Sequence, residues 1–278
     1  MLIFVSFVLY RTSVVRGIAI PVEDTGGVYY RSRGEPSMAS IIRSLAGGGT
    51  SNEDTILFLP GRVSDAWLKQ QRFRLERLAP LNLTINNPRV TDAGIAELTG
   101  ISEFRRLDLA DTSITDASMG TIAKLRFSAG AVLSVARTRV SDAAISQLLQ
   151  TPAGTRIGGL ELHSGQLTAA SIAAIQANRP LSWFGLYDAD DDSISRLLQL
   201  KLIAGVVIQG EDVSSSSLPV LEQLIQANSL ISMTLLDVPF TEAELQRLKQ
   251  FDVSCRVFAQ SSDEQRRFRM VSRPGNSR

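Results

Sequence analysis

The sequence predicts an α/β repeat protein in which about eight strand–helix units stack side by side, and two observations lead to this fold class. A short apolar strand followed by a (Val/Ile)-(Ser/Thr)-Asp-Ala step recurs at intervals of about 25 residues. Apolar residues at helical spacing follow the step, as with Ile145, Leu148 and Leu149. Because no unit of this kind can bury its apolar face alone, we expect the copies to stack into a solenoid.

The recurring step is found along most of the chain. Clear copies occupy residues 63–66, 90–93, 114–117 and 140–143. Weaker copies begin at Leu167, Val213 and Phe240, and an eroded copy lies near Asp190. The successive Ser, Thr or Asp positions of this series are 27, 24, 26, 27, 22, 24 and 27 residues apart. Repeats five to seven lose the Asp of the step, so their boundaries are the least well defined.

Each unit contains the signals of a strand followed by a capped helix. Leu107 and Leu109 alternate with polar residues, as expected for a strand with one buried face. The Ser or Thr of the step is a favourable helix N-cap, and the Asp after it lies where the helix dipole favours a negative charge. Thr241 and Glu244 have the spacing of a capping box.

The repeat pattern is similar to that of a known family. The run L-x-L-x-x-T-x-I-T-D-A at residues 107–117 resembles the leucine-rich repeat, in the Thr-Asp-Ala variety of planctomycete-like bacterial proteins. That variety is related to the cysteine-containing repeats of eukaryotic F-box proteins, with Thr in place of Cys. The resemblance implies a curved parallel strand ladder with helices on its convex side. It also implies a binding scaffold without chemistry of its own.

Segments on both sides of the repeats extend the resemblance. Residues 26–30 (Gly-Gly-Val-Tyr-Tyr) resemble the element that precedes such arrays, and residues 36–47 resemble their short entry helix. Residues 253–257 resemble the final strand. The apolar stripe along residues 38–45 independently predicts a helix that covers the first repeat.

We therefore expect four segments along the chain. They are an apolar N-terminal segment, 1–20; a capping strand and helix, 21–50; the solenoid, 51–258; and a basic tail, 259–278. The tail carries five arginines and no apolar periodicity, so we expect it to be disordered and to promote solubility.

The apolar run at residues 1–10 is too short to cross a bilayer as it stands. Ten helical residues span about 15 Å, which is half of the hydrocarbon core of roughly 30 Å. Three interpretations remain open: a membrane anchor that begins upstream, a peripheral apolar arm, and a cytoplasmic chain with an exposed apolar end. The first favours a membrane-anchored or cell-envelope location.

Composition excludes several classes of site. With 29 Lys+Arg against 28 Asp+Glu, the chain has no general attraction for nucleic acid or anionic lipid. A single cysteine, Cys255, excludes an internal disulfide framework and any multi-cysteine zinc site, and we expect it to be buried. We expect no cofactor and no small-molecule substrate.

The one histidine does not indicate catalysis. Leu160 and Leu162 are expected to point inward, which places Glu161 and His163 on the opposite, concave side. Ser134 is the only hydroxyl expected nearby, and no G-x-S-x-G elbow is present. We therefore expect an exposed surface histidine and no enzyme.

The acidic run at residues 188–192 has two interpretations. A calcium loop of the EF-hand type needs Gly at its sixth position and Glu at its twelfth, where this chain has Ser193 and Gln199. The run also falls where other repeats place their helix cap, where carboxylates are favourable without an ion. The cap is favoured, and a weak cation site remains the alternative.

The concave face is the remaining candidate for function. Trp183 and Phe184 are expected in the core, whereas alternation places a set of mostly polar residues on the outward side of the strands. These are Asn82, Thr84, Asn86, Arg106, Asp108, Ser134, Glu161, His163, Tyr187, Gln209 and Thr234. We expect a non-enzymatic scaffold that binds an unidentified protein on this face, with no nucleic acid as partner. The alternative is an envelope-associated structural protein tethered by residues 1–20.

One test follows directly from this placement. If Arg106 and Glu161 are exposed, reversing both charges weakens a true partner without unfolding the array.

Overall fold

The computed structural model confirms the α/β class, with helices alternating with the strands of a parallel sheet. It describes residues 13–15, 18–20, 28–33, 53–60, 63–77, 80–178, 180–227, 232–250 and 256–260. Within these residues, ten strands form one sheet in the order β12-β11-β10-β9-β8-β7-β6-β5-β4-β3. Neighbours from β4 to β12 pair in parallel, and β3 pairs antiparallel with β4 at the end of the sheet.

The strand order follows the order of the sequence. The strands of the sheet are β3 Val28–Arg33, β4 Glu53–Pro60, β5 Leu81–Asn86, β6 Phe104–Asp108, β7 Phe127–Ser134, β8 Ile157–His163, β9 Leu181–Tyr187, β10 Leu202–Gln209, β11 Ser232–Leu236 and β12 Arg256–Gln260. A separate antiparallel pair joins β1 Ser13–Val15 to β2 Ile18–Ile20. The helices are α2 Asp65–Glu76, α3 Asp92–Ala96, α4 Met119–Ile122, α5 Asp142–Leu149, α6 Ala169–Asn178, α7 Asp191–Leu197, α8 Leu218–Ala227 and α9 Glu242–Lys249. Short 3₁₀ turns lie at Asp116–Ser118, Gly154–Arg156, Ser164–Gln166 and Ser215–Ser217.

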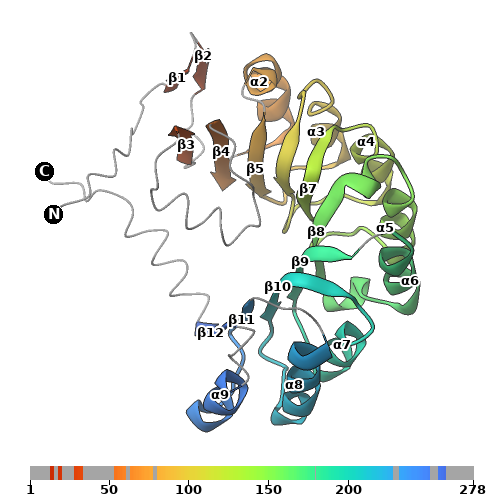
Figure 1. Ribbon diagram of the computed structural model, residues 1–278. Helices are drawn as coiled ribbons and strands as arrows, with labels where there is room; N and C mark the ends of the chain where they lie inside the picture. Colours follow the sequence, from red (N-terminus) through yellow and green to blue (C-terminus); the bar gives the residue numbers. More distant parts are fainter. Residues whose placement is uncertain are drawn as a thin grey trace, which may run out of the picture.

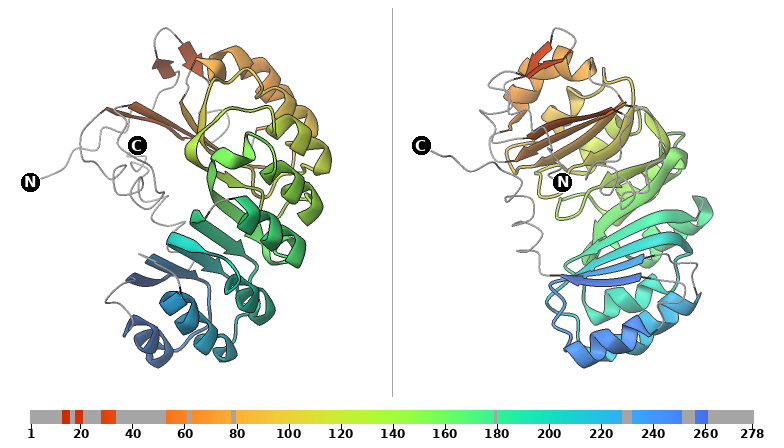
Figure 2. Two further views of the ribbon diagram at one scale, coloured as in Figure 1. Left: turned by 45° about the vertical axis from the view of Figure 1, so that its right-hand side comes forward. Right: turned by 60° about the vertical axis from the view of Figure 1, so that its left-hand side comes forward.

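All the labelled helices lie on one side of the strands (Figure 1), and the two rotated views in Figure 2 show the same arrangement. The apolar strand residues face these helices and form one continuous core, which includes Leu83, Leu107, Leu133, Leu160 and Phe184. Leu160 and Leu162 point into it, as predicted. The opposite face of the sheet carries no helix among the described residues, and we call it the open face.

The predicted helix caps are present. The side chains of Ser64, Thr91, Thr115 and Ser141 each accept a hydrogen bond from a backbone N–H in the first turn of the helix or 3₁₀ turn that follows. Thr241 and Glu244 form the predicted capping box. These contacts join residues two or three apart, so local sequence was sufficient to predict them.

The Asp of the step has a second role that the dipole argument did not predict. Its carboxylate accepts hydrogen bonds from the cap residue of the next repeat, and so ties one repeat to its neighbour. Asp65 accepts from the backbone N–H and hydroxyl of Thr91 at 2.8 and 2.6 Å. The same contact joins Asp92 to Thr115, Asp116 to Ser141, and Asp191 to Ser214. Only the hydroxyl contact is present between Asp142 and Thr168.

These contacts predict how stability depends on pH. Hydrogen bonds from Ser214 and Ser217 hold the pKa of Asp191 well below its ordinary value of 3.8. A carboxyl group with a lowered folded-state pKa stabilises the fold above its unfolded pKa, and this contribution is lost as the pH falls toward the folded pKa. We therefore expect the free energy of unfolding to fall below about pH 4, partly because of Asp191.

The Asp191→Asn variant isolates this contribution. It should be less stable than the parent near pH 7, and the difference should narrow as the pH approaches about 3. Urea unfolding across this pH range measures the free energy of unfolding of both proteins. A difference between them that does not change with pH would contradict the role given to the carboxylate of Asp191.

Several predicted segments have partial outcomes. The predicted strand at Val28 is present as β3, while the entry helix at 36–47 lies outside the described residues, as do residues 1–10, Cys255 and 261–278. A final strand is present at Arg256–Gln260, a few residues later than the predicted 253–257. Among the described helices, none has the length and apolar character needed to cross a membrane.

Candidate functional site on the open face of the sheet

The strand register arranges the open face in lateral rows. One row runs through Asn82, Arg106, Val132, Gly159, Trp183, Gly205 and Ser232. A second row runs through Thr84, Asp108, Ser134, Glu161, Gly185, Val207 and Thr234. His163 and Tyr187 are paired in a third row, nearer the carboxyl ends of the strands. Most of the predicted site residues are thus neighbours on one surface, although they come from seven different strands.

A polar cluster centred on Glu161 occupies the middle of this face. Arg106, two strands away, donates to both Glu161 carboxylate oxygens at 2.7 and 2.9 Å, and also lies 3.4 Å from Asp108. The indole N–H of Trp183 and the hydroxyl of Tyr187 donate to Glu161 at 3.3 and 3.5 Å. Burial opposes the charge on Arg106, but the charges of Glu161 and Asp108 outweigh it and raise the pKa of Arg106 above its usual range.

Two residues predicted to be exposed are buried in this cluster. Glu161 is 3% exposed and Ser134 is 0% exposed. Alternation predicted the correct face for both residues, but it could not predict what covers them. Strands lie about 4.8 Å apart, so the long side chains of Arg106, Trp183 and Tyr187 reach over the shorter ones beside them.

This burial corrects the expectation that both charges of the Arg106–Glu161 pair can be reversed harmlessly. The Glu161 side chain is only 4% exposed and depends on Arg106 for its ion pair. Reversing both charges would force a longer arginine side chain into the buried position of Glu161, so the double reversal is expected to disturb folding as well as the surface.

Glycines on the open face make room for the cluster. A Cβ atom on Gly185 would lie 2.8 Å from Cγ of Glu161 and 3.2 Å from the ring of Tyr187. A Cβ atom on Gly205 would lie 2.7 Å from the Trp183 ring. The Trp183 and Tyr187 rings fit close to Gly205 and Gly185 because these positions lack side chains. Trp183 therefore belongs to the open face and not to the core as predicted, whereas Phe184 is fully buried.

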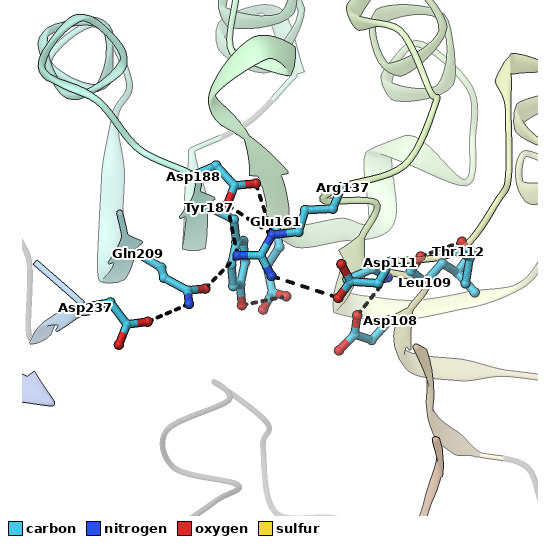
Figure 3. Close-up of polar contacts among 11 residues, drawn as sticks. Asp108, Leu109, Asp111, Thr112, Arg137, Glu161, Tyr187, Asp188, Gln209 and Asp237 are labelled. Atoms are coloured by element: carbon cyan, nitrogen blue, oxygen red, sulfur yellow. Dashed lines mark hydrogen bonds and ion pairs between the residues drawn. The ribbon is translucent and has the colours of Figure 1, made fainter. Parts of the chain in front are cut away.

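A second network follows the carboxyl edge of the sheet (Figure 3), and its members lie at or just after the ends of strands β6, β7, β9, β10 and β11. Arg137 donates from Nε to both carboxylate oxygens of Asp188 at 3.1 and 3.0 Å, and from Nη2 to Gln209 at 3.3 Å. Its guanidinium carbon lies 5.5 Å from the centre of the Tyr187 ring. Gln209 in turn donates to Asp237 at 2.8 Å, and Asp111 lies 3.9 Å from Arg137. The hydrogen bonds to Asp188 raise the pKa of Arg137.

Four members of this edge share an unusual backbone conformation. Asp111, Arg137, Asp188 and Asp237 have φ values of 60°, 55°, 50° and 54°. We call these four residues the edge row. The left-handed region is uncommon for residues other than glycine, and Asp adopts it more readily than most. Each residue lies two positions after a buried apolar residue at or just beyond the end of a strand, so aligning the repeats past the strands would have found this row.

His163 is half-buried rather than fully exposed as predicted. Burial lowers its pKa below 6.5, against the opposing effects of the Gln166 hydrogen bond and the charge of Asp188. Its backbone N–H donates to the side-chain oxygen of Gln166 at 3.1 Å. Its partner in the register is Tyr187, while Ser134 pairs with Glu161.

The acidic run at 188–192 does not form one cluster. Asp188 pairs with Arg137, Asp190 caps α7, and Asp191 accepts hydrogen bonds from the serines before α8. The cap interpretation is confirmed at Asp190. Across the part of the chain that the structure describes, no group of three or more His, Cys, Asp or Glu side chains is arranged to hold a metal ion.

The remaining predicted residues border the two networks. Asn82, Thr84 and Asn86 lie half-buried on β5, and Thr234 lies half-buried on β11. They belong to the same face as the cluster, but no side-chain bond joins them to it among the contacts described.

Comparison with known proteins identifies no family for this chain. Neither a protein-family model nor a curated protein sequence matches this chain.

Proposed function

We propose that this chain is a leucine-rich-repeat solenoid whose open face is the concave surface that binds a protein partner without catalysing a reaction. The 107–117 pattern and the regular alternation of strands and helices support the repeat type. The arc along which the strands succeed one another in Figure 1, with helices outside, supports the curvature. Stacked repeats commonly use such an extended inner surface for binding.

The observation that carries the binding proposal is the open face itself. Its polar side chains are held in fixed positions by contacts that cross several repeats, as with Arg106–Glu161 and Arg137–Asp188. Side chains that are already ordered lose little conformational freedom when a partner binds. Trp183, Tyr187 and Arg137 are also of the residue types that contribute most to protein interfaces.

The charge of this surface indicates the chemistry of the partner. Among the described side chains of these two networks, the guanidinium groups of Arg106 and Arg137 lie beside five carboxylates on the open face and the edge row. The five are Asp108, Asp111, Glu161, Asp188 and Asp237. Because the whole chain is close to neutral, this surface favours a partner segment with a positive charge.

Paired variants of the full chain test the proposal. Asp188→Asn with Asp237→Asn removes two negative charges from the edge row, and should reduce retention of the partner from a cell lysate about tenfold. The Asp188 ion pair is largely exposed, so its loss should cost less than about 1 kcal/mol of stability.

The matched control changes charge equally on the helix side. Gln147→Lys with Gln223→Lys raises the net charge by the same amount at exposed positions of α5 and α8. A partner lost by the first pair and kept by the second supports binding at the open face. Equal loss with both pairs would point to a general charge effect and contradict it.

A further inference from the structure

Each Asp contact that ties one repeat to the next is a rung, and the series of rungs is interrupted at one junction. Repeat five runs from β8 to α6, and repeat six runs from β9 to α7. In repeat five the position of the Asp is occupied by Ala169, which has no side-chain acceptor. The cap residue of repeat six, Asp190, donates its backbone N–H to Ser193 of its own repeat at 2.9 Å.

Loss of the Asp does not by itself remove the contact between two repeats. Between repeats seven and eight the Asp position is occupied by Ser215, and hydrogen bonding from this serine lowers the pKa of Glu244 in repeat eight. The roles are reversed, but a carboxylate still joins the two repeats. Within the described array, the junction between repeats five and six therefore differs from the other junctions.

The helices also pack least closely at this junction. Of the consecutive helix pairs from α2 to α9, α6 and α7 have the least contact. Long side chains join the two repeats here: Arg196 donates to the backbone carbonyl of Leu167 at 2.8 Å, and Gln176 donates to that of Gln199. Ordering a long side chain costs more conformational entropy than ordering an Asp, so these contacts hold the junction less firmly than a rung does.

The open-face side of the same junction is held firmly. Strands β8 and β9 pair in parallel without a register shift. The side chains of Trp183 and Tyr187 on β9 both donate to Glu161 on β8. Two repeats that are fixed along one side and weakly joined along the other have the geometry of a hinge.

We propose that the junction between repeats five and six is a hinge within the array. The pivot is the pair of strands β8 and β9, and helices α6 and α7 move apart or together on the other side of the sheet. Because each repeat contacts only its neighbours, one weak junction lets the repeats before and after it move as two units. The hinge goes beyond the proposed function, since it exists whether or not a partner binds. A partner of the open face that fits one hinge angle would shift the population toward that angle.

Pulsed electron paramagnetic resonance on the full chain tests the hinge through distances between spin labels. One pair of labels, at exposed positions Gln147 of α5 and Gln223 of α8, spans three junctions that include the hinge. A second pair, at Gln70 of α2 and Gln147, spans three junctions that all have an Asp rung. Cys255→Ser keeps the labels on the introduced cysteines. The distance distribution of the first pair should be about twice as broad as that of the second.

Supplying the absent rung should close the hinge. The double variant carries Ala169→Asp and Asp190→Thr. It reproduces the contact between Asp142 and Thr168 at the preceding junction, where the N–H of the cap residue is likewise donated to a serine. The 147–223 distribution should narrow to the width of the 70–147 distribution. Amide hydrogen exchange in α7 should slow about fivefold, as expected for one added hydrogen bond.

Asp116→Ala is the matched control, because it removes the rung to Ser141 between repeats three and four. It should broaden the 70–147 distribution and leave the 147–223 distribution unchanged. Thermal unfolding of each labelled variant confirms that it remains folded.

Three results would overturn the hinge. The first is an equal width of the two distributions in the parent chain. The second is a 147–223 distribution that the added rung does not narrow. The third is an Asp116→Ala variant whose 70–147 distribution equals that of the parent. None of these measurements includes a partner, so failure of the hinge leaves the proposed function to its own test.

Discussion

Replacing Arg106 by methionine should lower the free energy of unfolding by about 3 kcal/mol, the largest effect expected of any change on the open face. Glu161 would remain buried with its charge but without its guanidinium partner, since its side chain is only 4% exposed. Trp183 and Tyr187 would still donate hydrogen bonds to Glu161. The expected loss of stability is therefore at the lower end of the range for breaking a buried ion pair. Urea unfolding at neutral pH measures the loss.

The double variant Arg106→Met with Glu161→Gln is the control. It removes the unpaired charge while keeping a side chain of similar size, so it should recover a large part of the lost stability. The losses in free energy of unfolding of the two single variants are summed and compared with the loss in the double variant. If the two values are equal, the ion pair contributes nothing as a pair.

Gly185→Ala should destabilise the protein by about 1–3 kcal/mol, as expected when a methyl group is forced into a packed position. The new methyl would lie 2.8 Å from Cγ of Glu161, which is closer than real contacts allow. Glu161 cannot shift freely because Arg106 holds both of its carboxylate oxygens. The midpoint of urea-induced unfolding reports the change.

Gly120→Ala is the matched control for this substitution. Gly120 lies in α4 with nothing within 4 Å of an added Cβ, and its backbone is helical. Alanine there should leave stability unchanged or raise it by up to about 1 kcal/mol. If Gly185→Ala is tolerated equally well, the account of the glycines as space for the cluster is wrong.

Sequence alone predicted the parts of this fold that depend on near neighbours. The N-caps at Ser64 and Thr91 and the inward positions of Leu160 and Leu162 follow from contacts or alternation within a few residues. The contact from Asp65 to Thr91 was missed because it depends on how closely two repeats stack.

The candidate site was predicted less completely, because its contacts cross several repeats. The correct face was predicted for Glu161, but its burial results from side chains on strands β6 and β9. Arg137 and Asp188 are 51 residues apart, and neither was placed on the open face. Alternation within a strand predicts which way a side chain points, but not which side chains from other strands cover it.

Photochemical cross-linking is the most direct test of the claim that the open face binds the partner. A photoreactive phenylalanine analogue is placed at Thr234 on the open face, and separately at Gln223 on the neighbouring helix α8. Illumination in the cells from which the chain derives should attach one protein at Thr234 and none at Gln223. The same adduct from Gln223, or no adduct from Thr234, would contradict the account.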